Sequence, residues 1–288
     1  MRVEMKRAIL NDVLSREPTI PLYHYTGQAG LLGIIRDKQI WATHTQYLND
    51  TREYLHALDL VREEIKALLP AADQEAQLLL HEMMDAVPGI ETMNVCVCSF
   101  SEERDSLSQW RAYGSGTSSF AIGLSGEFLA AVTGKMNWYF ARCIYDMTTQ
   151  RNLIRSLVEE VLEQNIERKR AAKTVDYSPR GGSLCAYLNR YAPILKDISF
   201  SDEQEWRVIS RPLACEYELF GFREGRSHLT PYYKFPLEAE GLPFCLHEVV
   251  IGPTPDAELS RRSVRSFLVS KGLEDVPVAV SKIPYRTW

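Results

Sequence analysis

Three short stretches, far apart in the chain, carry side chains whose types suit ligand binding and catalysis. They are Tyr23-His24-Tyr25-Thr26, then Cys98-Ser99-Phe100-Ser101 followed by Trp110 and Tyr113, and finally Glu203-Gln204-Glu205-Trp206-Arg207. The first offers hydrogen-bonding groups, the second aromatic rings that can hold a flat ring, and the third two carboxylates. Each signal is weak by itself, so the elements that position the three stretches decide whether they form one site.

The two carboxylates of the third stretch stand two residues apart, directly before an apolar segment. In an extended segment the side chains at i and i+2 share a face, so Glu203 and Glu205 would both point into one cleft, where one of them would acquire a raised pKa. The structural alternative is a pair of solvated carboxylates at a strand edge. Arg207 would then be a same-face partner for Glu205 that adds little stability.

His24 ends a predicted strand, and a turn follows at once. A side chain in that place is well positioned to line a cleft, because strand ends lead into the loops that form sites. The structural alternative is a histidine that bonds to a backbone carbonyl.

The aromatic residues of the second stretch cluster after another predicted strand. Phe100, Trp110 and Tyr113 either form a platform for a flat ring or fill the core. A core position is the better interpretation of Trp110 alone. Gly114 and Gly116 beside Tyr113 leave room for a ligand or for close approach of the backbone.

The hydrophobic pattern predicts a mixture of strands and helices, and therefore an α+β fold. Strands are expected over residues 19–26, 40–45, 93–100, 119–124, 138–145, 206–210, 215–222, 229–237, 246–251 and 276–280. Helices are expected after Gly27, from Thr51 to Pro70, over 73–86, around Trp110 and Tyr113, and over 149–173, 184–198 and 257–271. Because no repeat or long linker divides this pattern, we expect a single domain over residues 1–288 with helical insertions at about 52–87 and 149–198.

Composition indicates an ordinary globular protein. The chain has 288 residues, 45% of them hydrophobic, and a formal net charge of -5. An acidic total disfavours a dedicated nucleic-acid binder, so small ligands and proteins become the more plausible partners. The six scattered cysteines are interpreted as reduced core thiols. With no signal peptide and no run of 18 apolar residues, we expect a cytoplasmic protein that does not enter a membrane.

The chain resembles domain-of-unknown-function family 2971, which is bacterial, over nearly its whole length. The resemblance lies in the HYT of residues 24–26, Leu48-Asn49-Asp50 with Glu53, CSFS with Trp110 and Tyr113, ExEWR at 203–207, EVVIGP at 248–253 and the terminal IPYR. Thr51 stands where members of that family often carry proline.

The same motifs resemble the ADP-ribosyltransferase fold, which implies a split, largely antiparallel sheet that binds NAD as a co-substrate. By this resemblance Glu205 is catalytic and holds the ribose, and Glu203 acts as a base toward the acceptor or orients Glu205. His24 is counted with the catalytic residues and bonds the adenosine ribose, and Thr26 assists it. Tyr25 is a further cofactor-binding residue, while Phe100 and Tyr113 clamp nicotinamide. Two departures are that Phe100 replaces the usual tyrosine and that the ExE pair occurs with a histidine on the first strand rather than an arginine.

The expected function is therefore an NAD-dependent transfer of ADP-ribose to a macromolecular acceptor, protein or nucleic acid, in a toxin or phage-defence effector. Two alternatives stay open. One is a catalytically silent member of the same fold that binds a nucleotide or a protein. The other, which lacks a compact ligand motif, is a metal-dependent hydrolase that uses His24, His44, Asp50 and Glu53. The sequence does not decide the acceptor, the oligomeric state, or the roles of Asn49, Asp50 and Glu53.

Overall fold

The fold combines one mixed sheet with helices on several sides. The computed structural model describes residues 2–48, 52–87, 94–113, 119–171, 183–225 and 227–284. The strands are β1 (Leu22–Gly27), β2 (Gln39–His44), β3 (Cys96–Ser101), β4 (Ser119–Leu124), β5 (Tyr139–Arg142), β6 (Glu205–Ile209), β7 (Phe220–Glu224), β8 (Leu229–Pro236), β9 (Glu248–Ile251) and β10 (Val278–Val280). Within the described residues they pair in the order β10-β9-β4-β1-β3-β2-β8-β7, while β6 pairs with both β3 and β5.

The sheet is mostly antiparallel, since β9 and β10 form the one parallel pair among the described strands. This agrees with the expected mixed fold. The helices are α1 (Arg2–Ser15), α2 (Gln28–Asp37), α3 (Arg52–Leu68), α4 (Gln74–Ala86), α5 (Leu107–Tyr113), α6 (Gly126–Lys135), α7 (Met147–Ala171), α8 (Ser183–Tyr191) and α9 (Ala257–Val269). Short 3-10 helices include η1 (Thr45–Tyr47), η2 (Leu69–Ala71), η5 (Ala192–Ile194) and η6 (Ile198–Glu203).

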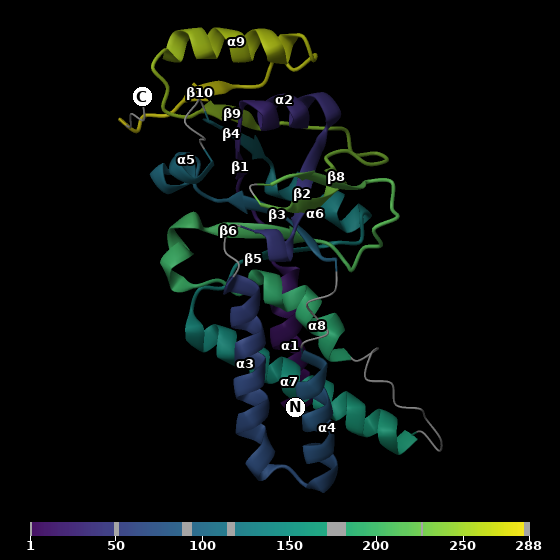
Figure 1. Cartoon of the computed structure of the whole chain (residues 1–288). Helices are drawn as coiled ribbons and strands as arrows, with labels where there is room; N and C mark the ends of the chain where they lie inside the picture. The colour runs from purple at the N-terminus through teal and green to yellow at the C-terminus, as the bar shows by residue number, and fades with distance from the viewer. Residues whose placement is uncertain are drawn as a thin grey trace.

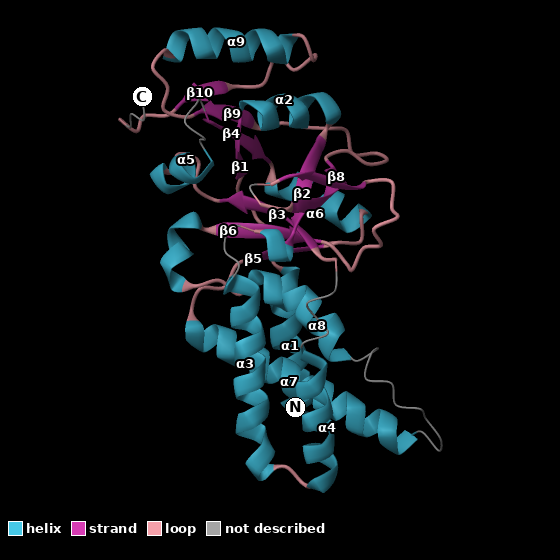
Figure 2. Cartoon of the chain, viewed as in Figure 1, coloured by secondary structure: helices cyan, strands magenta, loops and turns pink. Residues whose placement is uncertain are grey.

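Most of the helices form two groups around the sheet (Figures 1 and 2). Helices α1, α3, α4, α7 and α8 gather beside β5 and β6, whereas α2 and α9 lie at the opposite end of the molecule. One core cluster joins the sheet to α2, α6 and α9, and a second joins the first helical group to β5 and β6. No helix in the described part of the chain has the length and apolar character needed to cross a membrane.

Local sequence explains several element boundaries. The Asp73 carboxylate caps α4 by accepting from the Ala76 N–H at 2.9 Å, as the sequence predicted. The expected helix over 184–198 ends early, at Tyr191, because Pro193 has no N–H to donate to a continuing helix. The expected strand over 215–222 is largely wrong, since turns and a bend occupy 215–219 and the strand starts at Phe220. The sequence also failed to predict α1 and α6.

The sheet opens at the middle of β3. On one edge, β3 pairs with β6 along its length, from Val97 opposite Ile209 to Ser101 opposite Glu205. On its other edge, β1 reaches β3 only at Ser101, and β2 reaches it only at Cys96 and Val97. The backbone edge of residues 98–100 therefore faces neither β1 nor β2, and a gap opens between these two strands.

Candidate functional site

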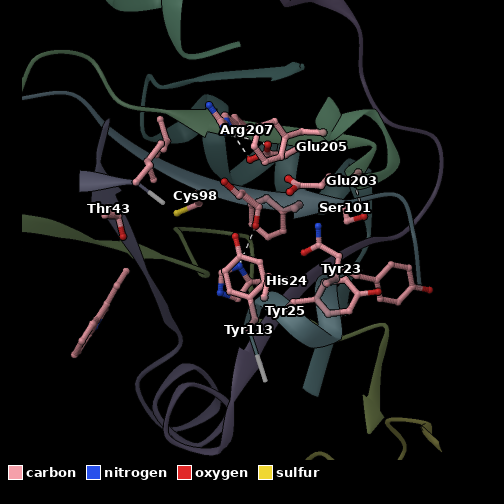
Figure 3. A pocket seen from close by; sticks show the side chains of 18 of the residues that line it. Tyr23, His24, Tyr25, Thr43, Cys98, Ser101, Tyr113, Glu203, Glu205 and Arg207 are labelled. Carbon is pink, nitrogen blue, oxygen red and sulfur yellow. Dashed lines mark hydrogen bonds and ion pairs between the residues drawn. The ribbon is translucent and has the colours of Figure 1, made fainter. Parts of the chain in front are cut away.

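A cleft of about 390 Å³ lies at this opening of the sheet. Six of the seven predicted site residues line it: His24, Tyr25, Phe100, Tyr113, Glu203 and Glu205. Thr26 is not among the lining residues, and its hydroxyl faces Gly30 of α2, where an added Cβ would lie 1.8 Å from Thr26 Oγ1. Figure 3 shows His24 and Tyr113 on one side of the cleft and both glutamates on the other. The three stretches noted in the sequence therefore meet in space.

His24 uses one ring nitrogen to complete the opened sheet. Its Nδ1 lies 3.0 Å from the carbonyl oxygen of Ser99, on the edge of β3 that no strand covers. Because a carbonyl only accepts, Nδ1 carries the hydrogen. Burial lowers the pKa of His24, and this outweighs the opposing effect of the Ser99 hydrogen bond. The ring is therefore neutral at pH 7, which leaves Nε2 as an acceptor. His24 therefore bonds a backbone carbonyl, as the structural alternative predicted, and it also lines the cleft.

The hydroxyls of Tyr23 and Tyr25 are hydrogen-bonded within the protein. The Tyr23 hydroxyl donates to Glu248 Oε1 at 2.8 Å. The Tyr25 hydroxyl donates to the Glu103 carbonyl at 2.5 Å and accepts from the Ser106 N–H at 3.1 Å. The Tyr25 hydroxyl thus fixes the loop before α5, and the Tyr23 hydroxyl reaches across β4 to β9. Both residues also line the cleft.

Glu205 is held by two cations. Its side chain is 5% exposed; Oε1 accepts from Arg207 Nε at 2.7 Å, and Oε2 accepts from Lys196 Nζ at 2.5 Å and from a terminal Arg207 nitrogen at 3.0 Å. Burial alone raises the pKa of Glu205, but the attraction of Arg207 and Lys196 outweighs burial and lowers it to about 2. Glu205 is thus a charged carboxylate at pH 7, and both of its oxygens accept hydrogen bonds from the two cations.

Glu203 lies in a different environment, although it shares Lys196 with Glu205. Its Oε2 lies 2.5 Å from Lys196 Nζ, and its side chain is 24% exposed. Burial raises its pKa and the nearby ammonium of Lys196 only partly opposes this effect. The expectation of an extended Glu203-x-Glu205 segment is wrong, because Glu203 ends η6 and Gln204 adopts a left-handed conformation with φ of 43°. The carboxylates converge because the chain turns between them.

The aromatic residues divide between the core and the cleft rim. Trp110 is a core residue, as expected; its ring packs edge-on against Tyr25, and its Nε1 donates to Asp105 Oδ1 at 2.7 Å. Phe100 is 1% exposed and forms the cleft floor beside His24. Tyr113, at the end of α5, is 39% exposed, and burial of its hydroxyl together with the Glu205 and Glu203 carboxylates raises its pKa to about 12.

Sequence reasoning missed Lys196, which joins the two glutamates. Its side chain is 5% exposed. The sequence signal that could have identified Lys196 was its place directly after the apolar residues 192–195, because a buried charge there needs partners. Arg207 was considered only as a surface partner, yet it is buried, and its NH1 donates to the Pro193 carbonyl at 2.6 Å.

The structure describes the side chains of only two residues of the hydrolase alternative, His24 and His44. In the described part of the chain, no group of three or more histidine, cysteine, aspartate and glutamate side chains is arranged to hold a metal ion. His44 accepts from the Gln46 N–H through Nδ1, at 3.2 Å. Asn49, Asp50, Thr51 and the side chain of Glu53 lie outside the described residues.

Comparison with known proteins gives a match to one family over part of the chain and indicates no activity. Residues 109–208 match the sequence model of a family described as protein of unknown function (DUF2971). The matched stretch includes Tyr113, Lys196, Glu203, Glu205 and Arg207, whereas His24 lies outside it. No curated protein and no solved structure matches the chain.

Proposed function

We propose that the cleft binds NAD, that the protein cleaves the bond between nicotinamide and ribose, and that it transfers ADP-ribose to a macromolecular acceptor. The observation that carries the proposal is the meeting of His24, Tyr113 and the two glutamates at the opening of the sheet. These groups come from three distant segments, and each suits one part of a dinucleotide. A toxin or phage-defence effector is the biological setting that we propose for this activity.

The chemistry needs a negative charge beside the ribose. Loss of nicotinamide passes through an oxocarbenium-like state, and a nearby carboxylate stabilises its positive charge. We assign this role to Glu203, because its carboxylate is partly exposed to the cleft and only one of its oxygens accepts from a described residue. The resemblance noted in the sequence would assign it to Glu205, but both oxygens of that carboxylate are already bonded to cations.

The remaining groups would orient the dinucleotide. The unprotonated Nε2 of His24 accepts a hydrogen bond from a ribose hydroxyl, and the ring of Tyr113 covers the nicotinamide. Glu205 keeps Lys196 and Arg207 in place, and Lys196 in turn holds Oε2 of Glu203. In this scheme Glu205 is a positioning residue.

The test is incubation with NAD labelled in both halves. We expect wild-type protein to release nicotinamide and to label a macromolecule in a cell extract. Glu203→Gln should lower the rate of release about 100-fold or more, on the scale of a lost electrostatic contact to the transition state. Glu216→Gln, at an exposed position outside the cleft, is the matched control and should act as wild type.

One outcome would contradict the proposed enzyme activity. If wild-type protein forms neither free nicotinamide nor a labelled macromolecule from NAD, and if Glu203→Gln and Glu205→Gln give the same result in this assay, the proposed reaction is wrong.

One observation favours a second candidate, a protein that binds the nucleotide without cleaving it. The two carboxylates face two cations, Lys196 and Arg207, so the cluster has no net charge and attracts a developing cation less strongly. Equilibrium dialysis separates the candidates: a silent binder retains NAD in the protein chamber and returns it intact.

A further inference from the structure

The end of the cleft formed by β2 carries a stacked aromatic pair that the proposed chemistry does not use. Trp41 of β2 stacks on Tyr232 of β8, with ring centroids 4.3 Å apart and planes at 19°. Tyr232 is buried, whereas Trp41 is 48% exposed and lines the cleft. One face of the Trp41 ring is therefore covered and supported, and the indole remains accessible from the cleft.

Strand pairing explains why this pair is rigid. Tyr232 lies opposite Thr43 on one side and opposite Gly221 on the other. A Cβ added at Gly221 would lie 3.1 Å from Tyr232 Cζ, so the glycine makes room for the tyrosine ring. The ring of Tyr232 thus packs closely over the backbone of β7 and supports the covered face of the Trp41 ring.

A cation lies beside this platform. Arg223 of β7 lines the same end of the cleft, and its guanidinium donates to Thr43 Oγ1 at 3.2 Å. Arg223 is exposed, and no carboxylate of the described residues forms an ion pair with it. Unlike Lys196 and Arg207, it keeps its charge available for an anionic ligand.

We propose that Trp41, Thr43 and Arg223 form a binding subsite for a nucleoside phosphate. The base would stack on the accessible face of Trp41, and the phosphate would accept from Arg223 and from the Thr43 hydroxyl. Stacking on an aromatic ring and pairing with an arginine are the two interactions that a base with an adjacent phosphate makes best. This subsite goes beyond the proposed reaction, because nucleotide binding here requires no cleavage.

Two sources supply this chemistry: the adenylate half of NAD, and a nucleotide of an acceptor. The probe that serves both is AMP, measured by isothermal titration calorimetry, with adenosine for comparison. We expect AMP to bind wild-type protein more tightly than adenosine does, and its affinity to fall with added salt.

Two substitutions separate the stacking from the charge. Trp41→Ala should weaken AMP binding about tenfold or more, while Trp41→Phe keeps a ring and most of the affinity. Arg223→Gln should reduce the affinity for AMP to that for adenosine. Phe222→Ala is the matched control: Phe222 is 57% exposed and neighbours Arg223 in β7, so alternation places it on the opposite face of the strand. It should bind AMP as wild type does.

Competition with NAD identifies the source. Displacement of NAD by AMP assigns the subsite to the adenylate half of NAD, whereas simultaneous binding of both assigns it to an acceptor nucleotide. The subsite is disproved if wild-type protein does not bind AMP, or if Trp41→Ala and Arg223→Gln bind it as wild type does. Failure of NAD cleavage with normal AMP binding would contradict the proposed reaction and leave the subsite standing.

Discussion

Replacing Glu205 with glutamine tests the electrostatic balance at the base of the cleft. Burial raises the pKa of Glu205, but Arg207 and Lys196 outweigh burial and bring it from 4.5 to about 2. A carboxylate whose pKa is lowered in the folded state stabilises that state above its unfolded pKa, and this contribution is lost as the pH falls through the folded pKa.

The size of the effect follows from the pKa difference. A change from 4.5 to about 2 corresponds to about 3 kcal/mol of folding free energy at pH 7. Glutamine keeps the shape of the side chain but not its charge. We therefore expect Glu205→Gln to lower the free energy of unfolding by about 3 kcal/mol at pH 7, and by only about 1 kcal/mol at pH 3.

Glu203→Gln is the matched control, because burial raises the pKa of Glu203 instead of lowering it. A group whose pKa is raised by burial gains nothing from its charge at pH 7, so this substitution should leave stability unchanged or increase it slightly. The two glutamates share Lys196, so the comparison isolates the sign of the electrostatic effect.

The assay is urea unfolding of wild type and both variants at pH 7 and at pH 3, with the slope of the transition compared to confirm equal exposed surface. Equal losses for Glu203→Gln and Glu205→Gln would refute the distinction drawn between the two carboxylates. A loss for Glu205→Gln that is the same at both pH values would show that charge is not its cause.

Three further predictions concern single contacts that stabilise the fold. Asp73→Ala removes the cap that bonds the Ala76 N–H and should cost about 1 kcal/mol in urea unfolding, with no effect on AMP binding. Asp105→Ala releases the Ser281 hydroxyl, which donates to Asp105 Oδ1 at 2.6 Å, and should speed proteolysis of the C-terminal segment. Gly126→Ala places a Cβ 2.3 Å from the Pro18 carbonyl oxygen and should lower the melting temperature by several degrees, whereas an unchanged value would show that the loop before β1 yields freely.

Local sequence patterns predicted most of the helices and strands, because these elements depend on residues that are close together in the chain. The helices α3, α4 and α7 follow apolar residues at helical spacing, and the limits of β4 were predicted to the residue. A local signal also marks the start of α6, because Ser125 caps this helix by accepting from the Phe128 N–H at 3.4 Å.

The arrangement within the site depends on residues that no local pattern links. Lys196 reaches both glutamates only because the chain folds back after η5, and the left-handed Gln204 turns Glu203 toward the same ammonium. The alternation of side chains between the two faces of β6 could nevertheless be predicted from the sequence. Trp206 belongs to the core cluster of the sheet, so Arg207 must face the other side.

That alternation also explains why the helical insertion matters for the cleft. The side of β6 that carries Glu205 and Arg207 also carries Ile209, which belongs to the core shared with the helices. Arg207 bonds the Pro193 carbonyl at the end of the insertion, and Lys196 follows three residues later. The insertion thus supports β6 by packing against it, and it provides Lys196, the cation that holds the two glutamates. Helix α2, which crosses from β1 to β2, packs in the apolar core on the opposite face of the sheet. In the proposed function a ligand enters from the side of Tyr113, where the glutamates and the Trp41 platform can contact it together.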